Sequence, residues 1–451
     1  MLQPATDRIP RRAVAGYAVG SVGTGGFGTL PGLVLAYYLT DTLAVPALLA
    51  TVVVIVPKVW DVLIDPAVGA LSDREARGSA TRTRLMALGA LTLPIGFIGM
   101  FAAPAGLPPV MAGLWVLVFF VLATSSFSLF QVPYIALPAD LTSDYAERTR
   151  LMAWRIAVLA LAILLVGAGG PAVRDAACGG STGYLVMGVV VATVLLLGML
   201  GTVLGVRGRR PHDDGGGTPH AAPATTYRAG LAAFRELPAY RRLLVVFVLQ
   251  ALATGTMLAA AQYVATYTLD DQAALTLLFV ALVAPALLVV PFWTRYAGRV
   301  GKPAALTAAS VMFAAASLGL VALLWAPGWW VYLPVALAGV GYAGMQLFPL
   351  AMLPDVIHAA GRHRGGAMSG LWTAGETAGM ALGPVVVLLL LALGGFRSST
   401  ADQTLAQPDA AHVMIVLAFS LLPALLVGAS LLVLRSYDDP VPARASSEVP
   451  A

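Results

Sequence analysis

The sequence contains little charge and almost no cysteine. Charged residues make up 11% of the 451 residues and apolar residues 59%, whereas a soluble domain carries about 25% charged residues. So little charge cannot cover the surface of a water-soluble protein of this size, and so much apolar content excludes a disordered chain. The single cysteine excludes an intramolecular disulfide and a cysteine-based zinc site. These absences leave a membrane protein whose outer surface meets lipid.

Apolar stretches long enough to cross a bilayer recur along the whole chain. A spanning helix needs about 20 predominantly apolar residues. Twelve stretches qualify: about 13–39, 45–71, 84–103, 109–138, 151–170, 183–206, 243–267, 273–294, 303–325, 329–354, 366–394 and 411–434. The sequence therefore predicts an all-α membrane protein with twelve transmembrane helices. The first stretch is too long for a cleaved signal peptide and is expected to be retained.

Basic residues alternate from one inter-helix loop to the next. Five loops on one side each hold two or more arginines or lysines, whereas the loops on the other side hold only Arg174 and Arg397. Because basic loops remain in the cytoplasm, we expect both termini there, in a bacterial plasma membrane. The alternation also supports the helix count, since one missed helix would disrupt it.

A polar segment rich in Gly and Pro divides six predicted helices from six. The expected units are an N-terminal bundle (1–206), a linker (207–240), a C-terminal bundle (241–436) and an unstructured tail (437–451). Within the linker, a short amphipathic helix at about 227–237 either lies on the membrane surface or is an ordinary connection.

The two halves carry a matching sequence. The fourth and tenth stretches end in QVPYIALPAD and QLFPLAMLPD, in which Gln, Ala and Asp have the same spacing. Because the two runs occupy equivalent positions six helices apart, they indicate an internal duplication. Two duplicated bundles around a central cavity are typical of secondary transporters.

Three ionisable residues lie together in the second stretch. Lys58, Asp61 and Asp65 are spaced i, i+3 and i+7 and so share one helix face. Lys58 and Asp61 are expected near the bilayer midplane, and Asp65 about 6 Å nearer the cytoplasm. A charged face is costly in lipid, so we expect it to line the interior. A salt bridge would account for Lys58 and one carboxylate but leaves the second carboxylate without a partner. Asp61 and Asp65 are therefore the predicted site for a coupling cation or proton.

Further polar residues are candidates for the cavity and its ends. Glu376, near the middle of the eleventh stretch, either pairs with Lys58, serves as a coupling site, or accepts a hydrogen bond from the solute. Arg155 either binds solute or extends to the membrane surface. The other candidates for solute contact, each of which could instead serve packing, are Tyr17, Lys58, Gln131, Tyr134, Gln346, Trp372 and Thr373. Four residues at helix ends are expected to make gate or hinge contacts: Asp73, Arg74, Asp140 and Asp355.

The motif at the end of the second stretch resembles a known family. KVWDVLIDPAVGALSDR, from Lys58 to Arg74, is similar to the glycoside–pentoside–hexuronide:cation symporters of the major facilitator superfamily, and AYYLTD, VPYIAL, ERTRL and LPDVI agree with it. The resemblance implies a melibiose-permease-like carrier with alternating access, with Asp61 and Asp65 at the cation site and Arg155 beside the solute. Gly25 and Gln131 stand where such sugar carriers have acids.

The predicted function is secondary active transport by cation- or proton-coupled symport. The expected solute is a sugar, a glycoside or another small organic molecule. One alternative solute is an amphiphile such as a lysolipid, because relatives with the motif of the second stretch transport lysolipids. The alternative to symport is proton-driven efflux. The coupling ion is H+ or Na+, and we expect no cofactor.

The expected partners are the solute, the coupling cation and the lipid bilayer, without nucleic acid, and the expected form is a monomer. An embedded enzyme is the less supported class, because the sequence holds no HExxH motif and no Walker loop.

Overall fold

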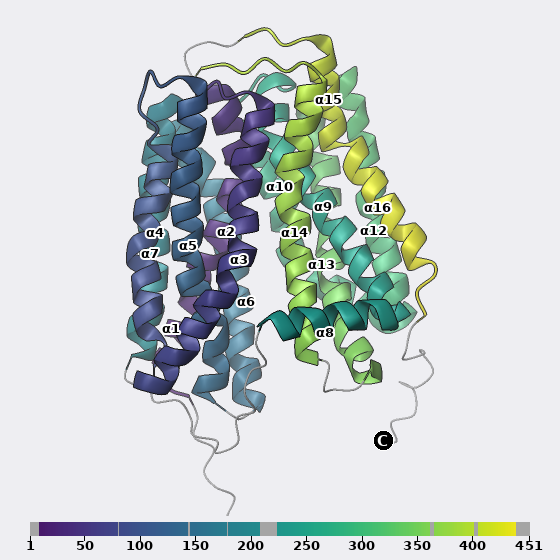
Figure 1. Ribbon diagram of the computed structural model, residues 1–451. Coiled ribbons are helices and arrows are strands. Elements are labelled where there is room, and N and C mark those ends of the chain that lie inside the picture. The colour runs from purple at the N-terminus through teal and green to yellow at the C-terminus, as the bar shows by residue number, and fades with distance from the viewer. Residues whose placement is uncertain are drawn as a thin grey trace, which may run out of the picture.

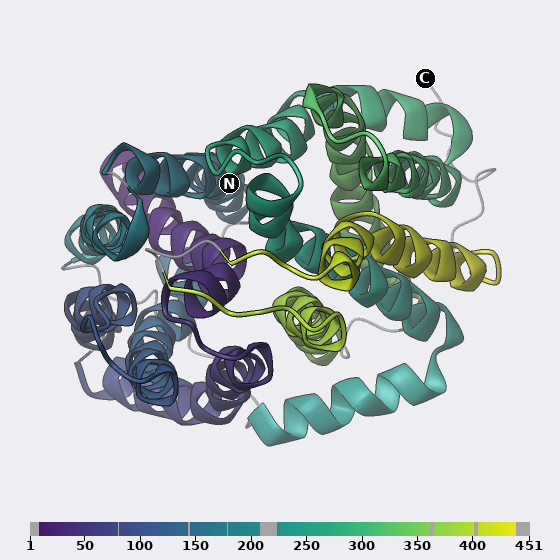
Figure 2. The same ribbon diagram turned by 90° about the horizontal axis from the view of Figure 1, so that it is seen from above.

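The protein is an upright bundle of helices. The computed structural model describes residues 9–79, 81–142, 145–177, 179–207, 223–360, 365–400 and 405–438. Within these ranges it is helical apart from loops and one isolated β-bridge, between Leu43 and Thr400. Two groups of long helices stand side by side, and a horizontal helix crosses the lower part of the second group on its outer side (Figures 1 and 2). The predicted all-α fold class is confirmed.

The first group contains the helices up to residue 206. They are α1 (Arg11–Val19), α2 (Ser21–Tyr37), the π-helix η1 (Tyr38–Thr42), α3 (Ala47–Ser79), α4 (Thr83–Phe101), α5 (Pro109–Leu141), α6 (Tyr145–Ala176) and α7 (Gly180–Val206). The helix α6 is longer than the predicted 151–170, because polar residues such as Glu147 and Arg150 continue it beyond the apolar stretch.

The second group follows the linker helix α8 (Pro223–Glu236). It contains α9 (Pro238–Tyr267), α10 (Ala274–Leu288), α11 (Val290–Val300), α12 (Lys302–Gly319), the 3-10 helices η2 (Leu320–Leu324) and η3 (Trp329–Val331), α13 (Tyr332–Ala360), α14 (Gly365–Leu393), α15 (Asp409–Phe419) and α16 (Leu421–Leu434).

The number of possible spans depends on one bent helix. Among the described residues, eleven helical segments are long and apolar enough to cross a membrane. The count becomes twelve if α10 and α11, which meet at an angle of 53°, form one span. The predicted stretch 273–294 did not include this break. Pro291 at the start of α11 lacks a backbone N–H, which is an ordinary cause of a helix kink.

The two ends of the bundle differ in composition. We call the end that holds residues 9–11, 223–238 and 435–438 the basic end, because Arg11, Arg235 and Arg435 lie there. The end that holds residues 394–400 and 405–408 is the opposite end, where these residues cross above the bundle (Figures 1 and 2).

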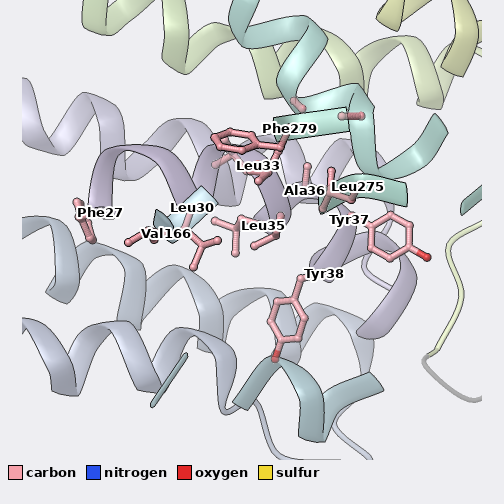
Figure 3. Close-up of a cluster of buried hydrophobic side chains, with 14 of the residues drawn as sticks. Phe27, Leu30, Leu33, Leu35, Ala36, Tyr37, Tyr38, Val166, Leu275 and Phe279 are labelled. Carbon is pink, nitrogen blue, oxygen red and sulfur yellow. The ribbon is translucent and has the colours of Figure 1, made fainter. Parts of the chain in front are cut away.

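Buried apolar side chains join the two groups mainly toward the opposite end. One core cluster combines Leu33 and Tyr37 of α2 with Leu275 and Phe279 of α10 (Figure 3). A second cluster, near the basic end, draws only on α8 and the second group, for example through Trp293. The described residues of the two groups therefore share a continuous core toward one end only.

Close backbone contact holds α9 against α14. Gly255 of α9 faces Gly383 of α14 so closely that a Cβ on Gly383 would overlap backbone atoms of Gly255 and Thr256. Within lipid, helices associate through close packing rather than through the hydrophobic effect, and small residues permit such crossings. The two glycines therefore set the distance between these helices.

Gly383→Ala is expected to destabilise the protein, because α14 must move away from α9 to admit the methyl group. Overpacking of this kind costs about 1–3 kcal/mol, so the apparent melting temperature in detergent should fall. The matched control is Gly428→Ala in α16, where nothing lies within 4 Å of the added Cβ. Equal melting temperatures for the two variants would contradict the close crossing.

Candidate functional site

The carboxylates of α3 lie against a polar face of α5. Ser128 of α5 donates a hydrogen bond to Asp61 Oδ1 over 2.8 Å, and the same hydroxyl lies close to Asp65. One turn earlier, Trp60 Nε1 donates to Ser125 Oγ, also over 2.8 Å. Both aspartates are half-buried and close enough to repel each other. The site therefore concentrates negative charge around one serine.

Lys58 does not clamp these carboxylates. Its ammonium lies 5.9 Å from the centre of the Phe120 ring and attracts Asp61 without reaching ion-pair distance. No ion pair of Lys58, Asp61 or Asp65 occurs in the part of the chain that the structure describes. The two carboxylates therefore remain available to a mobile cation.

Tyr17, Tyr134 and Arg155 form a second cluster in the first group. Tyr134 stacks on Tyr17 with ring centres 4.9 Å apart, and its hydroxyl donates to the Tyr17 carbonyl over 2.9 Å. The Arg155 guanidinium of α6 lies 5.3 Å from the centre of the Tyr134 ring. Because Tyr134 is fully buried, Arg155 turns inward rather than toward the membrane surface.

Arg155 has unused capacity to bind an anion. Its Nε is buried without a hydrogen-bond partner, and it forms no ion pair among the described residues. A planar guanidinium binds carboxylate or phosphate through paired hydrogen bonds. This side chain can therefore hold an anionic group.

Three candidates lie on neighbouring turns of α14 but have different surroundings. Trp372 is buried and stacks on Phe247 of α9 at 4.5 Å, so it packs within the second group. Thr373 is exposed. Glu376 is half-buried, and it pairs neither with Lys58 nor with any other cation in the described ranges.

The two glutamines of the matching runs lie in different environments. Gln346 of α13 donates from Nε2 to the Tyr342 hydroxyl over 3.0 Å, and Glu376 lies near that tyrosine. Gln131 of α5 has a buried amide oxygen without a hydrogen-bond partner. Gln131, Glu376 and Arg155 are thus interior polar groups with hydrogen-bonding capacity to spare.

Asp355 forms an ion pair at the basic end of the second group. Lys302 Nζ lies 2.6 Å from Asp355 Oδ2 and donates to the Ala351 carbonyl over 3.0 Å. This contact joins the start of α12 to the end of α13. It therefore links neighbouring helices within one group.

The other helix-end candidates are Arg74, Asp73 and Asp140. Arg74 is exposed, and the side chains of Asp73 and Asp140 lie outside the described residues. The adjacent Glu75 accepts two backbone N–H groups at the start of α4, over 2.8 and 3.1 Å. A carboxylate there satisfies amides that have no partner within the helix.

Side chains of both groups meet in a hydrogen-bonded layer at the opposite end. Thr40 Oγ1 shares a hydrogen bond with the Tyr263 hydroxyl of α9 over 2.8 Å. The buried carboxylate of Asp41 accepts hydrogen bonds from Thr40 and from the Tyr267 hydroxyl. These hydrogen bonds join η1, which follows α2, directly to α9.

A second contact ties α6 to α9 at the same end. Arg174 is only 2% exposed. Its Nη1 donates to Gln262 Oε1 over 2.8 Å, and its Nε donates to Asp175 over 2.8 Å. The guanidinium is therefore one of the groups that hold the two halves together.

Residues 394–400 and 405–408, which follow α14, lie across this end. We call these residues the strap. The Ser399 N–H donates to the Thr40 carbonyl, and the Ala44 N–H donates to the Ser399 carbonyl, each over 2.9 Å. The Gln407 side chain bonds to the backbone N–H and C=O of Arg397, each over 2.8 Å, and closes the loop. These hydrogen bonds join the two groups toward the opposite end.

The sequence analysis did not single out several of these groups. Ser128 belongs to a polar run, TSSFS, inside an otherwise apolar stretch, and that run was an available signal. Asp41 ends its apolar stretch, and Arg174 is a rare basic residue on its side. Tyr267 carried no signal, because its partner lies in the other half of the chain.

The chain matches known transporters in sequence and in structure. A family model described as MFS/sugar transport protein matches residues 16–438. The sodium-dependent lysophosphatidylcholine symporter 1 of Mus musculus is 28% identical over 377 residues, which cover 76% of this chain and 69% of that protein. The sphingosine-1-phosphate transporter MFSD2B of Mus musculus is 25% identical, with 76% and 71% covered. A solved D-xylose–proton symporter superimposes with a TM-score of 0.68 at 12% identity over 95% of this chain and 97% of that one.

These matches narrow the resemblance seen in the motif. The relatives are named for lysophosphatidylcholine and sphingosine-1-phosphate, so a melibiose-permease-like carrier and carbohydrate transport are not supported. The superfamily, the symport function and the non-enzymatic class are supported. The chain is a multi-pass membrane transporter, and it belongs to the MFS/sugar transport protein family.

Proposed function

We propose that this protein is a Na+-coupled symporter of a single-chain amphiphile of the lysophospholipid kind. The observation that carries the proposal is the pair Asp61 and Asp65, two half-buried carboxylates around Ser128 without an ion-paired cation in the described chain. Relatives named as sodium-dependent lysophosphatidylcholine symporters in mouse and chicken support both the ion and the solute class.

Coupling follows from the cost of burying charge. Lys58, Asp61 and Asp65 together carry a net charge of −1 when ionised. Moving that charge into an occluded interior is costly unless it is neutralised. A cation bound by the two carboxylates and the Ser128 hydroxyl would remove the cost, because these are hard oxygen ligands. Loading the cation therefore favours the closed form that carries the solute across.

The interior suits an amphiphile better than a sugar. Arg155 is an inward-facing guanidinium that can hold a phosphate. At Gly25, a Cβ would lie 3.2 Å from the Leu159 carbonyl oxygen. An acidic sugar ligand at that position would point into α6 rather than into an open space.

The conformation corresponds to one step of alternating access. The strap and the Asp41 layer close the opposite end, because they hydrogen-bond the first group to the second there. We place the basic end in the cytoplasm on the arginine distribution. The protein is then closed on the side away from the cytoplasm, and both termini are cytoplasmic.

Asp61→Asn is expected to abolish lysophosphatidylcholine accumulation driven by a Na+ gradient, because the amide cannot neutralise the cation. Uptake of labelled lipid into proteoliposomes should fall to the rate without a gradient, with the protein still folded. Asp409→Asn, at the exposed start of α15, is the matched control and should transport normally. Accumulation by Asp61→Asn at the wild-type rate would remove the coupling mechanism. If a proton gradient alone drives lipid uptake by the wild-type protein, the coupling ion is H+ and not Na+.

Arg155→Gln is expected to weaken lysophosphatidylcholine binding about tenfold or more, because a charge-assisted hydrogen bond contributes about 1.5–3 kcal/mol. Thermal stabilisation of the purified protein by added lipid measures the affinity. The control is Arg150→Gln, whose guanidinium pairs with Glu147 at the start of α6. Unchanged affinity in Arg155→Gln would exclude a headgroup contact.

A disulfide between Leu43→Cys and Thr400→Cys is expected to stop transport, because it fixes the β-bridge that must open at the opposite end. Antiparallel bridge partners lie about 4.5–5.5 Å apart at Cα, which suits a disulfide. Cys178→Ser provides the background, and either single cysteine is the control. Reducing agent should restore uptake, whereas full transport by the cross-linked protein would show that this bridge does not open.

A further inference from the structure

The linker helix α8 lies where lipid headgroups are expected. It runs horizontally at the basic end, across the direction of the upright helices (Figure 1). Seen along the bundle axis, it lies on the outer rim and not beneath the centre (Figure 2). A helix at this level and on this rim is positioned at the boundary between membrane and water.

The inner face of α8 is fixed to α14. A Cβ on Gly230 would lie 2.8 Å from the Ala367 carbonyl oxygen, so the two helix backbones are nearly in contact. Ala233, one turn later, is 1% exposed and belongs to the core cluster that contains Met368 and Trp372. α8 therefore touches the same helix that carries Thr373 and Glu376.

The outer face of α8 combines an apolar and a basic side chain. Leu231 is 44% exposed, and the exposed Arg235 lies one turn further along the same face. Arg241, also exposed, donates from Nη1 to the Arg235 carbonyl over 3.4 Å, which brings a second guanidinium to this place. Neither arginine forms an ion pair among the described residues, and together they outnumber the adjacent Glu236.

We propose that α8 binds acidic phospholipid headgroups and fastens α14 to the membrane surface. Leu231 enters the boundary between headgroups and acyl chains, and Arg235 and Arg241 bind the phosphates. Each arginine near an anionic surface strengthens binding about fivefold. Because Gly230 and Ala233 pack against α14, lipid binding by α8 also holds the basic end of α14 at a fixed depth in the bilayer. This depth is retained when the two helix groups change their tilt during transport.

The first test compares the full-length protein in phosphatidylcholine vesicles with and without phosphatidylglycerol. Phosphatidylglycerol should raise the apparent melting temperature of the wild type, and high salt should reduce the rise. Arg235→Gln/Arg241→Gln should lose most of it. The matched control, Arg295→Gln/Arg299→Gln, removes two exposed arginines from α11 at the same end and should keep it. An equal loss in both double variants, or no rise in the wild type, would overturn the proposal.

The second test locates the helix directly. A fluorophore on Leu231→Cys, in the Cys178→Ser background, should be quenched by lipids with brominated tails when phosphatidylglycerol is present. A fluorophore that remains in water would overturn the lipid assignment and leave this face to a soluble partner.

Discussion

The cost of placing charge in lipid governs the whole arrangement. Ionisable side chains lie at the two ends of the bundle or between helices, and the long apolar runs meet the bilayer. The few charges near the midplane therefore mark the interior. Asp61, Asp65 and Arg155 form no ion pair among the described residues. The two carboxylates lie on α3 and the guanidinium lies on α6.

The closure at the opposite end is cooperative by construction. The buried carboxylate of Asp41 depends on Thr40 and Tyr267, and Thr40 is bonded in turn to Tyr263 and, through its carbonyl, to the strap. Breaking one bond would leave a buried polar group without a partner, which costs more than the bond contributed. The layer is therefore stable when fully formed or when fully hydrated, and a half-open state is disfavoured. Such behaviour suits a transporter that must not leak.

The sequence predicted the helices well, because about 20 apolar residues are a local requirement that each span meets by itself. It did not predict the break before Val290, since proline is frequent inside these spans and only the neighbouring helices decide which one bends. The hydrogen bond from Ser128 to Asp61 joins residues far apart in the chain, and no spacing rule reaches that distance. The burial of Trp372 against Phe247 was equally hidden, because a helix that is apolar all round gives no sign of its inner face.

Because of the glycine contact between them, α9 and α14 are expected to move as one rigid unit. Near the opposite end α9 holds Asp41 through Tyr267, and at its middle it clasps α14, which carries Glu376 farther toward the basic end. A rotation that frees Asp41 must therefore swing Glu376 as well, since neither helix can slide past the other at Gly255 and Gly383. Opening the opposite end and changing the position of the Glu376 carboxylate therefore occur together.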